Sequence, residues 1–206
     1  MRALSFAVLA IVASHALAAE ETRDLPEFKA IKSTGAYRLI ITAGQPQSVV
    51  VSADEAVLSR LSTKVIGDEL VISTPDEGSS RWKDKATIRI GVGQLGKLKM
   101  AGVGETTVTN LSSDIFKLDY EGVGAVKAQG KVKRFVLSAE GVGSLNARAL
   151  EAQQVDVSLG GVGSVTVYAS ESLDAKVGGI GSLTYYGKPA RVSKSAGGIG
   201  GISAGE

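Results

Sequence analysis

Residues 121–165 read EGVGAVKAQGKVKRFVLSAEGVGSLNARALEAQQVDVSLGGVGSV and contain three copies of the triplet Gly-Val-Gly. With Val or Ile in the middle, this triplet stands six times in the second half of the chain. Successive first glycines are 20, 19, 20, 18 and 19 residues apart. A near-constant period of this size is typical of a solenoid, in which each repeat forms one turn that stacks on the previous turn.

The residues on both sides of each triplet alternate between apolar and polar. Phe116, Leu118 and Tyr120 precede one triplet at every second position, and Val126 and Ala128 follow it. Alternation with period two predicts strands with one buried face. Each repeat is therefore expected to contain a strand, a glycine corner, a second strand and a looser turn.

The triplet glycines are expected at corners between two sheets, because a corner needs backbone angles that side chains resist and because stacked coils leave no room there. The middle Val or Ile is expected to point inward and fill the corner. The predicted corner glycines are Gly102, Gly104, Gly122, Gly124, Gly141, Gly143, Gly161, Gly163, Gly179, Gly181, Gly198 and Gly200.

These patterns predict an all-β protein: a parallel, right-handed β-helix of about five coils of 18–20 residues. A left-handed hexapeptide helix is the alternative, but it requires steps that are multiples of six. A calcium-binding nonapeptide solenoid would need an Asp in each repeat, which is missing here.

The region before the repeats predicts further β structure and one short helix. Strands are expected over 36–42, 48–52, 70–72 and 86–90, where β-branched and apolar residues gather. Asp54 to Leu61 predicts a helix that Asp54 caps and that covers the N-terminal end of the solenoid. A polar loop from Pro75 to Lys85 holds Trp82, the only tryptophan.

The first 18 residues predict export. Arg2, an apolar run and Ala16-Leu17-Ala18 are typical of a cleavable signal peptide. Residues 19–27 are then expected to be a flexible lead-in, and 28–206 a single domain. No later run is apolar enough to span a bilayer, so the mature chain is expected in the periplasm or outside the cell.

Composition excludes several classes of chemistry. The single histidine, His15, leaves with the signal, and the chain has no cysteine, which excludes Ser-His triads, cysteine nucleophiles and the usual zinc sites. Loss of Arg2 lowers the count of Lys and Arg from 23 to 22, against 21 acidic residues. These charges are interspersed, so no nucleic-acid partner is expected, and no cofactor is predicted.

The chain resembles the head GIN domain family of putative auto-transporter adhesins. The resemblance covers residues 28–206 and rests on the glycine triplets and on the segments Phe28–Ile31, Gly35–Tyr37, Leu39–Ile41 and Asp68–Ile72. It implies a β-helical protein of the bacterial cell envelope and supplies no catalytic residues. Because the sequence stops at Glu206 without a translocating barrel, a periplasmic or released protein is expected rather than a displayed one.

Carboxylates provide the first candidate sites. Asp156 and Asp174 are expected side by side on adjacent coils, where two carboxylates can share a proton or flank a glycosidic bond. Glu121 and Glu140, with Asp119 nearby, form a weak candidate for a Ca²⁺ site. Solvated surface acids are the more common explanation for both groups.

A hydroxyl-lined face is the second candidate, as a binding surface for a glycan or an envelope protein. Its predicted residues form two columns: Ser144, Ser164 and Ser182, and then Asn146, Thr166 and Thr184. Tyr168, Tyr185 and Tyr186 are candidate stacking residues for a glycan.

Two functions follow from these candidates. The first is a non-enzymatic envelope protein with a role in adhesion, binding or scaffolding. The alternative is a polysaccharide lyase or hydrolase that uses surface carboxylates. The glycine-rich last coil, in which Lys194 interrupts the buried column, also predicts either homo-oligomers through the C-terminal coil or a frayed end.

Overall fold

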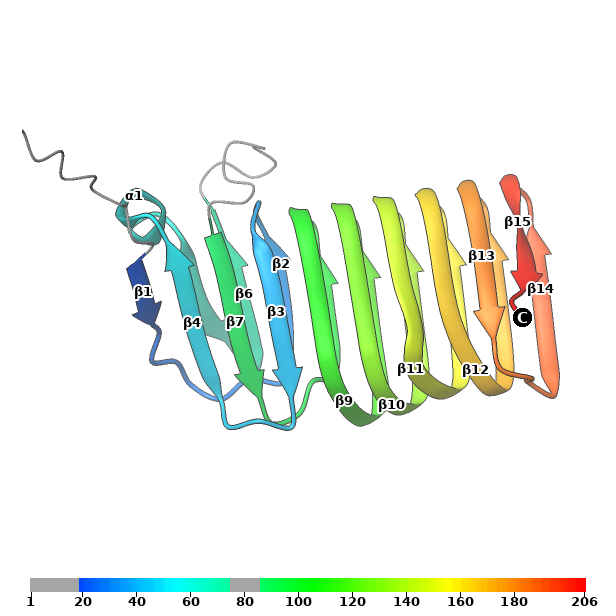
Figure 1. The fold of residues 1–206 in the computed structure, drawn as a ribbon, viewed down its shortest axis with the longest axis horizontal. Coiled ribbons are helices and arrows are strands. Elements are labelled where there is room, and N and C mark those ends of the chain that lie inside the picture. Colours follow the sequence, from blue (N-terminus) through cyan, green and yellow to red (C-terminus); the bar gives the residue numbers. More distant parts are fainter. Residues whose placement is uncertain (1–18, 75–85) are drawn as a thin grey trace, which may run out of the picture.

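The computed structural model describes residues 19–74 and 86–206. The predicted signal peptide and the predicted loop around Trp82 lie outside the described residues. Figure 1 shows an elongated stack of coils, with the N-terminal strands at one end and the C-terminus at the other. The fold is an all-β solenoid of about five turns with N-terminal sheet strands and one short helix, which confirms the predicted fold class.

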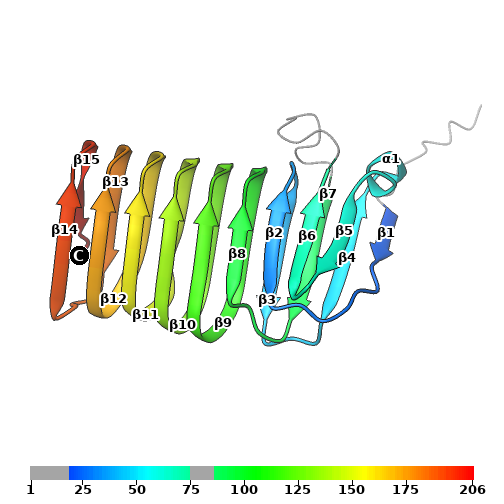
Figure 2. The same ribbon diagram turned by 180° about the vertical axis from the view of Figure 1, so that it is seen from behind.

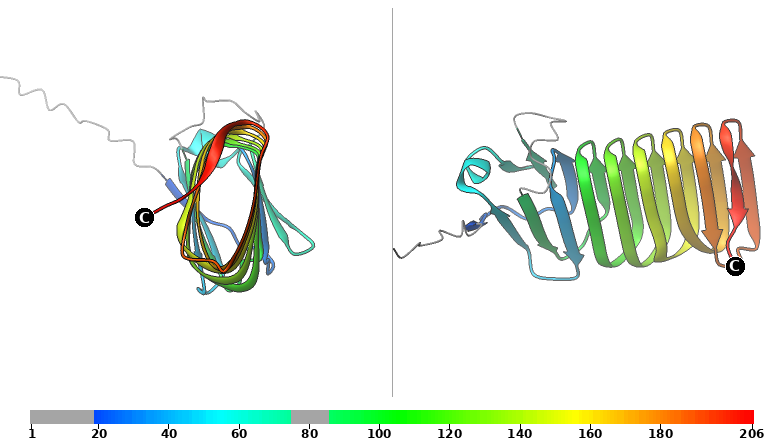
Figure 3. Two further views of the ribbon diagram at one scale, coloured as in Figure 1. Left: turned by 90° about the vertical axis from the view of Figure 1, so that its right-hand side faces the viewer. Right: turned by 45° about the horizontal axis from the view of Figure 1, so that its top comes forward.

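Four long strands each form most of one coil. They are β9 (Val103–Tyr120), β10 (Val123–Ala139), β11 (Val142–Leu159) and β12 (Val162–Val177). Each strand runs along one face, bends and returns along the opposite face, so that the end-on view in Figure 3 encloses a flattened oval. The expected second strand, looser turn and next strand are therefore one continuous element.

The coils pair in parallel and in register. Val123 is opposite Val103 on one side and Val142 on the other, so that each triplet stacks on the next. The next coil is divided into β13 (Ile180–Tyr186) and β14 (Arg191–Ala196), and β15 (Ile199–Ala204) begins a further coil. Within the described residues, β14 pairs with β12 alone, and β15 with β13 alone.

The N-terminal region extends both faces of the solenoid with separate strands. On one face β9 is followed by β3 (Arg38–Ala43), β7 (Ala86–Val92), β4 (Ser48–Ala53) and β1 (Ala19–Thr22). On the other face it is followed by β8 (Lys97–Met100), β2 (Ala30–Thr34), β6 (Glu69–Ser73) and β5 (Ser62–Ile66), which Figure 2 shows from behind. The outermost strands, β1 and β5, both run antiparallel to their neighbours.

Two N-terminal predictions need correction. Part of the lead-in is ordered, because Ala19–Thr22 pairs with β4 along its whole length. The predicted helix is shorter than expected: α1 spans Glu55–Leu58, and the Asp54 side chain makes no capping hydrogen bond. The predicted strands over 36–42, 48–52, 70–72 and 86–90 correspond to β3, β4, β6 and β7.

The core runs the length of the solenoid and consists of the alternating inward residues. The predicted inward positions of β9 to β12 are buried, including Phe116, Leu137 and Val157. Hydrophobic burial of this kind is the main stabilising term in such a fold. In β14 the same positions are exposed, with Val192 at 42% and Lys194 at the interruption that the sequence predicts.

The middle residues of the triplets point outward, so the predicted inward orientation is wrong. The exposed fraction is 49% for Val123, 48% for Val142 and 53% for Ile180. Because successive residues of a strand face opposite sides, the buried position after the corner is Val126 or its equivalent, which puts the triplet centre outside. The outward triplet residues, here called the apolar ladder, are Val123, Val142, Val162, Ile180 and Ile199, whereas Val103 of the first triplet is half-buried and packs against the core.

Candidate binding surfaces of the solenoid

The glycines flanking the apolar ladder stack directly on one another. Gly143 lies opposite Gly124, and a Cβ atom added to Gly143 would collide with the Gly124 carbonyl oxygen. Gly143 also has a φ of 142°, a conformation that side chains disfavour. The chain bends at the first glycine of each triplet from Gly102 to Gly198, and the strand restarts at the middle residue.

The two predicted hydroxyl columns are assembled next to this corner. Ser144, Ser164 and Ser182 lie in register on β11, β12 and β13. Asn146, Thr166 and Thr184 form the next column of the same face. The three serines are exposed, whereas Thr166 and Thr184 are half-buried. The surface they form is a flat sheet.

The predicted catalytic carboxylates are neighbours, but a cation already holds one of them. Asp156 lies opposite Asp174, and Arg134 Nε donates to Asp156 Oδ2 at 2.7 Å. This bond occupies one carboxylate oxygen of Asp156 and ties it to Arg134 rather than to Asp174. The arrangement therefore fits a surface ion pair better than an acid–base pair.

The three weak calcium candidates are not gathered into one site. Lys99 Nζ donates to Glu121 Oε1 at 2.8 Å, and this hydrogen bond raises the Lys99 pKa. Glu140 lies beside Gly160 of the next coil, and Asp119 faces Ser138. No group of three or more acidic side chains in residues 19–74 and 86–206 is arranged to hold a metal ion.

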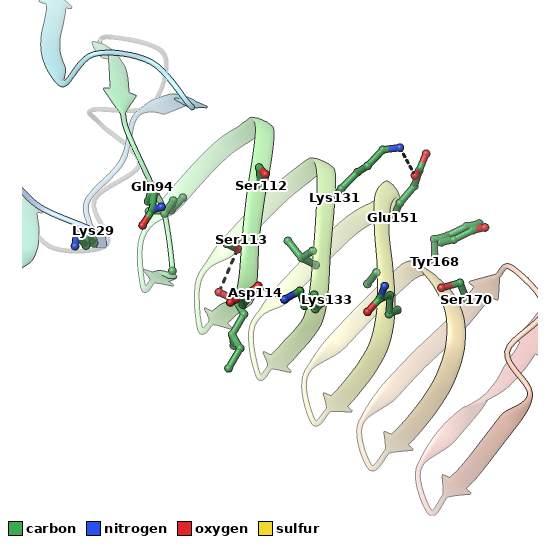
Figure 4. A pocket seen from close by; sticks show the side chains of 16 residues that line it. Lys29, Gln94, Ser112, Ser113, Asp114, Lys131, Lys133, Glu151, Tyr168 and Ser170 are labelled. Carbon is green, nitrogen blue, oxygen red and sulfur yellow. Dashed lines mark hydrogen bonds and ion pairs between the residues drawn. The ribbon is translucent and has the colours of Figure 1, made fainter.

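A hollow in the described surface lies where β9 to β12 bend from one face to the other. Its volume is about 800 Å³, within the range of ligand sites. The exposed side chains of the bend form its rim, and the small buried residue Ala152 is part of its lining. This hollow is called the bend groove, and Figure 4 shows its lining.

Two polar columns form the walls of the bend groove. The first column is in strict register across four coils and consists of Ser112, Lys131, Glu151 and Tyr168. The second column lies two positions further along each strand and consists of Asp114, Lys133, Gln153 and Ser170. Lys29 and Gln94 extend the groove at its N-terminal end (Figure 4).

Ion pairs cross between coils within both columns. Lys131 Nζ lies 3.0 Å from Glu151 Oε2, and Lys133 Nζ lies 2.7 Å from Asp114 Oδ1. The hydrogen bond to Asp114 raises the Lys133 pKa. All four side chains are well exposed to solvent, so each pair contributes little stability and can exchange its partner for a ligand group.

The three candidate tyrosines have different surroundings. Tyr185 is buried, with Lys194 Nζ 4.5 Å from its ring centroid. Arg148 covers Tyr186 at 3.8 Å. Tyr168 is half-buried and lines the bend groove.

Sequence reasoning missed the bend groove because the bend has no repeating residue type. The pairing register shifts there, between Lys127 and Gln129 and between Ala147 and Glu151. The variation of the repeat from 18 to 20 residues is the one signal that marks this region as irregular.

Comparison with known proteins supports the fold. A putative adhesin of Bacteroides fragilis matches with a TM-score of 0.73 at 24% identity, over 90% of this chain and 96% of that one. Putative adhesins of Parabacteroides distasonis (TM-score 0.56, 20% identity) and Parabacteroides merdae (0.52, 16%) each match over 91% of this chain and 96% of theirs. At these identities the likeness shows the fold alone. No curated protein matches the chain.

The family model described as "Putative auto-transporter adhesin, head GIN domain" matches residues 27–189, which is most of the chain. That span contains the N-terminal sheet strands other than β1, the first five glycine triplets and the bend groove. The chain therefore belongs to the head GIN domain family of putative auto-transporter adhesins.

Proposed function

We propose that the protein is an extracytoplasmic binding protein of the adhesin type, which acts without catalysis through the bend groove. The observation that carries this proposal is the groove itself: a hollow of about 800 Å³ whose walls present one polar side chain from each coil in two columns. A rigid solenoid holds these side chains at a fixed spacing, so the surface is organised before a ligand arrives. The family name and the predicted signal peptide support a location outside the cytoplasm.

The residues favour binding over catalysis. The acids of the groove, Asp114 and Glu151, are each paired with a lysine in exposed positions. Asp156, the strongest candidate for acid–base chemistry, lies on the returning face and is paired with Arg134. No described helix is long and apolar enough to cross a membrane, and the proposal needs none.

Binding of the mature chain to isolated bacterial envelopes and to mucin-coated surfaces tests the proposal. A double substitution, Ser112→Trp with Ser170→Trp, fills the groove and is expected to abolish binding, whereas Ser144→Trp with Ser182→Trp fills the hydroxyl face and is expected to leave it unchanged. Loss of binding in the Ser144→Trp and Ser182→Trp variant alone would place the binding site on the hydroxyl columns instead. Release of sugar fragments that Asp156→Asn abolishes would instead establish the enzymatic alternative.

A further inference from the structure

The chemistry of the bend groove indicates the class of its ligand. Hydroxyl, amide and charged side chains form most of both walls, and the exposed Ile115 and the ring of Tyr168 add apolar surface. An apolar ligand would bury these polar groups without partners, which costs free energy. A ligand with many hydroxyl groups and an apolar ring face would satisfy both kinds of side chain, and sugars have this combination.

The repeat of the groove suits a polymer. Coils stack about 4.8 Å apart, so each wall offers a new polar side chain at that interval along the solenoid axis. The sugar units of an extended polysaccharide repeat on a similar scale. Ser112, Lys131 and Glu151, one from each coil, are therefore spaced to contact successive sugar units.

Tyr168 marks the C-terminal end of the groove. Its side chain stands at the C-terminal end of the groove in Figure 4, after Glu151 in the first column. Tyr186 continues the column on the next coil, but the guanidinium of Arg148 already lies over its ring. In the described part of the chain, Tyr168 has no hydrogen bond or ring partner of its own; its ring packs beside Gly187, and its exposed part can stack on a sugar.

Charge distinguishes this ligand from other polymers. Lys29, Lys131 and Lys133 face two acids, Asp114 and Glu151, which leaves the groove with a net charge of only +1. This balance is too small for a nucleic-acid backbone, which is bound through many unpaired cations. A peptide strand would need a free sheet edge, and the strands that form the groove are paired on both sides.

We propose that the bend groove is a binding site for a polysaccharide chain that lies along the solenoid axis, with one sugar stacked on Tyr168. This inference rests on the proposed function and specifies its ligand class. Lys131 and Lys133 can turn from Glu151 and Asp114 to the carboxylates of an acidic sugar, because both ion pairs are exposed. An acidic chain would therefore use the lysines, and a neutral chain would use the ring and the uncharged walls.

Isothermal titration of the mature chain with two probes tests this inference. The probes are a neutral glucose hexasaccharide and a galacturonate hexasaccharide. Tyr168→Ala is expected to weaken binding of either sugar that binds by about 10-fold, the loss of one stacking contact. Its matched control is Tyr186→Ala, one coil further on, which is expected to leave binding within about twofold.

Substitutions of the groove lysines distinguish binding of the acidic sugar from binding of the neutral sugar. Lys131→Gln with Lys133→Gln is expected to reduce galacturonate binding by about 10-fold and to leave glucose binding unchanged. Lys127→Gln with Lys176→Gln makes the same charge change on other columns of the solenoid and is the control. Melting curves of each variant identify any that fail to fold.

The outcomes distinguish the inference from the proposed function. Sugar binding that Tyr168→Ala and both lysine changes leave intact would overturn the groove as the site while preserving a binding function. Absence of binding to either sugar, with envelope binding that still depends on the groove, would overturn the ligand class alone. Absence of both activities would overturn the inference and the proposed function together.

Discussion

Phe116 and Phe135 lie one above the other in the core, with ring centroids 5.8 Å apart and ring planes 9° from parallel. They occupy the same inward position of β9 and β10. Parallel coils in register place like residues on like residues, so a single position of the repeat becomes a continuous stack through the core. Both rings are buried, with exposed fractions of 0% and 1%.

Phe135→Ala is therefore expected to cost about 3–5 kcal/mol of unfolding free energy, because it removes buried apolar surface and leaves a cavity below Phe116. Urea unfolding followed by circular dichroism measures this loss. Phe135→Leu keeps most of the volume and is expected to cost clearly less. Equal costs for the two variants would show that cavity formation does not limit the stability of this stack.

The corner glycines give a second prediction. Gly143→Ala is expected to destabilise the fold by about 2 kcal/mol or more, because the new methyl group would meet the Gly124 carbonyl oxygen at a φ of 142°. Gly178→Ala is the matched control near another corner, where a Cβ atom has nothing within 4 Å. Similar melting temperatures for both variants would contradict the close backbone approach.

The apolar ladder gives a third prediction, which separates the outward orientation from the inward one. Val142→Thr is expected to change the unfolding free energy by less than about 0.5 kcal/mol, because Val142 is 48% exposed. Val126→Thr, a change of the same type at a buried position, is expected to cost at least about 1 kcal/mol, because the hydroxyl would be buried. A large loss for Val142→Thr would restore the inward orientation.

The ladder also shows where prediction from the sequence reaches its limit. Alternation assigned the inward residues correctly, because Leu118, Leu137 and Val157 follow a strict period of two. The prediction for the triplet centres is wrong because Val123 is apolar but exposed, and hydrophobicity alone does not imply burial. An apolar residue is often exposed when the backbone, here glycine on glycine, already fills the corner.

Of the two candidate binding surfaces, the sequence predicts the hydroxyl columns but not the bend groove. The hydroxyl columns lie on regular strands, so the alignment of Ser144 with Ser164 could be predicted from the period. The bend groove depends on register shifts and on an irregular bend. These are three-dimensional properties that spacing along the chain does not contain.

A fourth prediction concerns alkaline pH. Burial raises the Tyr37 pKa well above its usual value of 10.0, although Ser33 donates or accepts a hydrogen bond at 2.9 Å. Because the folded pKa exceeds the unfolded one, the stability is fully present below pH 10 and falls as the pH rises above it, with a slope of up to about 1.4 kcal/mol per unit.

Urea unfolding at pH 8, 9, 10 and 11 measures this slope. Tyr37→Phe cannot ionise and is expected to unfold with a shallower pH dependence, although it is less stable at pH 8 because it loses the hydrogen bonds to Ser33 and to the Ile72 carbonyl. Parallel curves for the two proteins would show that another group causes the alkaline loss.

The last prediction concerns association through the coil of β14 and β15. Val192 and Ile199 are 42% and 73% exposed, and within the described residues this coil pairs on one side only. The opposite end of the solenoid is covered differently: β1 is short and antiparallel, and its Glu20 carboxylate lies 3.2 Å from the Arg89 guanidinium. Short charged strands of this kind discourage edge-to-edge pairing, whereas exposed apolar strands favour it.

Two copies of the mature chain are therefore expected to associate through their β14–β15 coils into a closed, two-fold dimer rather than a filament. Light scattering over a range of concentrations should show a mass that rises to twice the monomer value and then stops. Val192→Lys with Ile199→Lys is expected to keep the chain monomeric, and Ile66→Lys, which changes an exposed residue at the other end, is expected to leave the dimer intact. A mass that keeps rising would indicate head-to-tail contacts, and a constant monomer mass would exclude association through this coil.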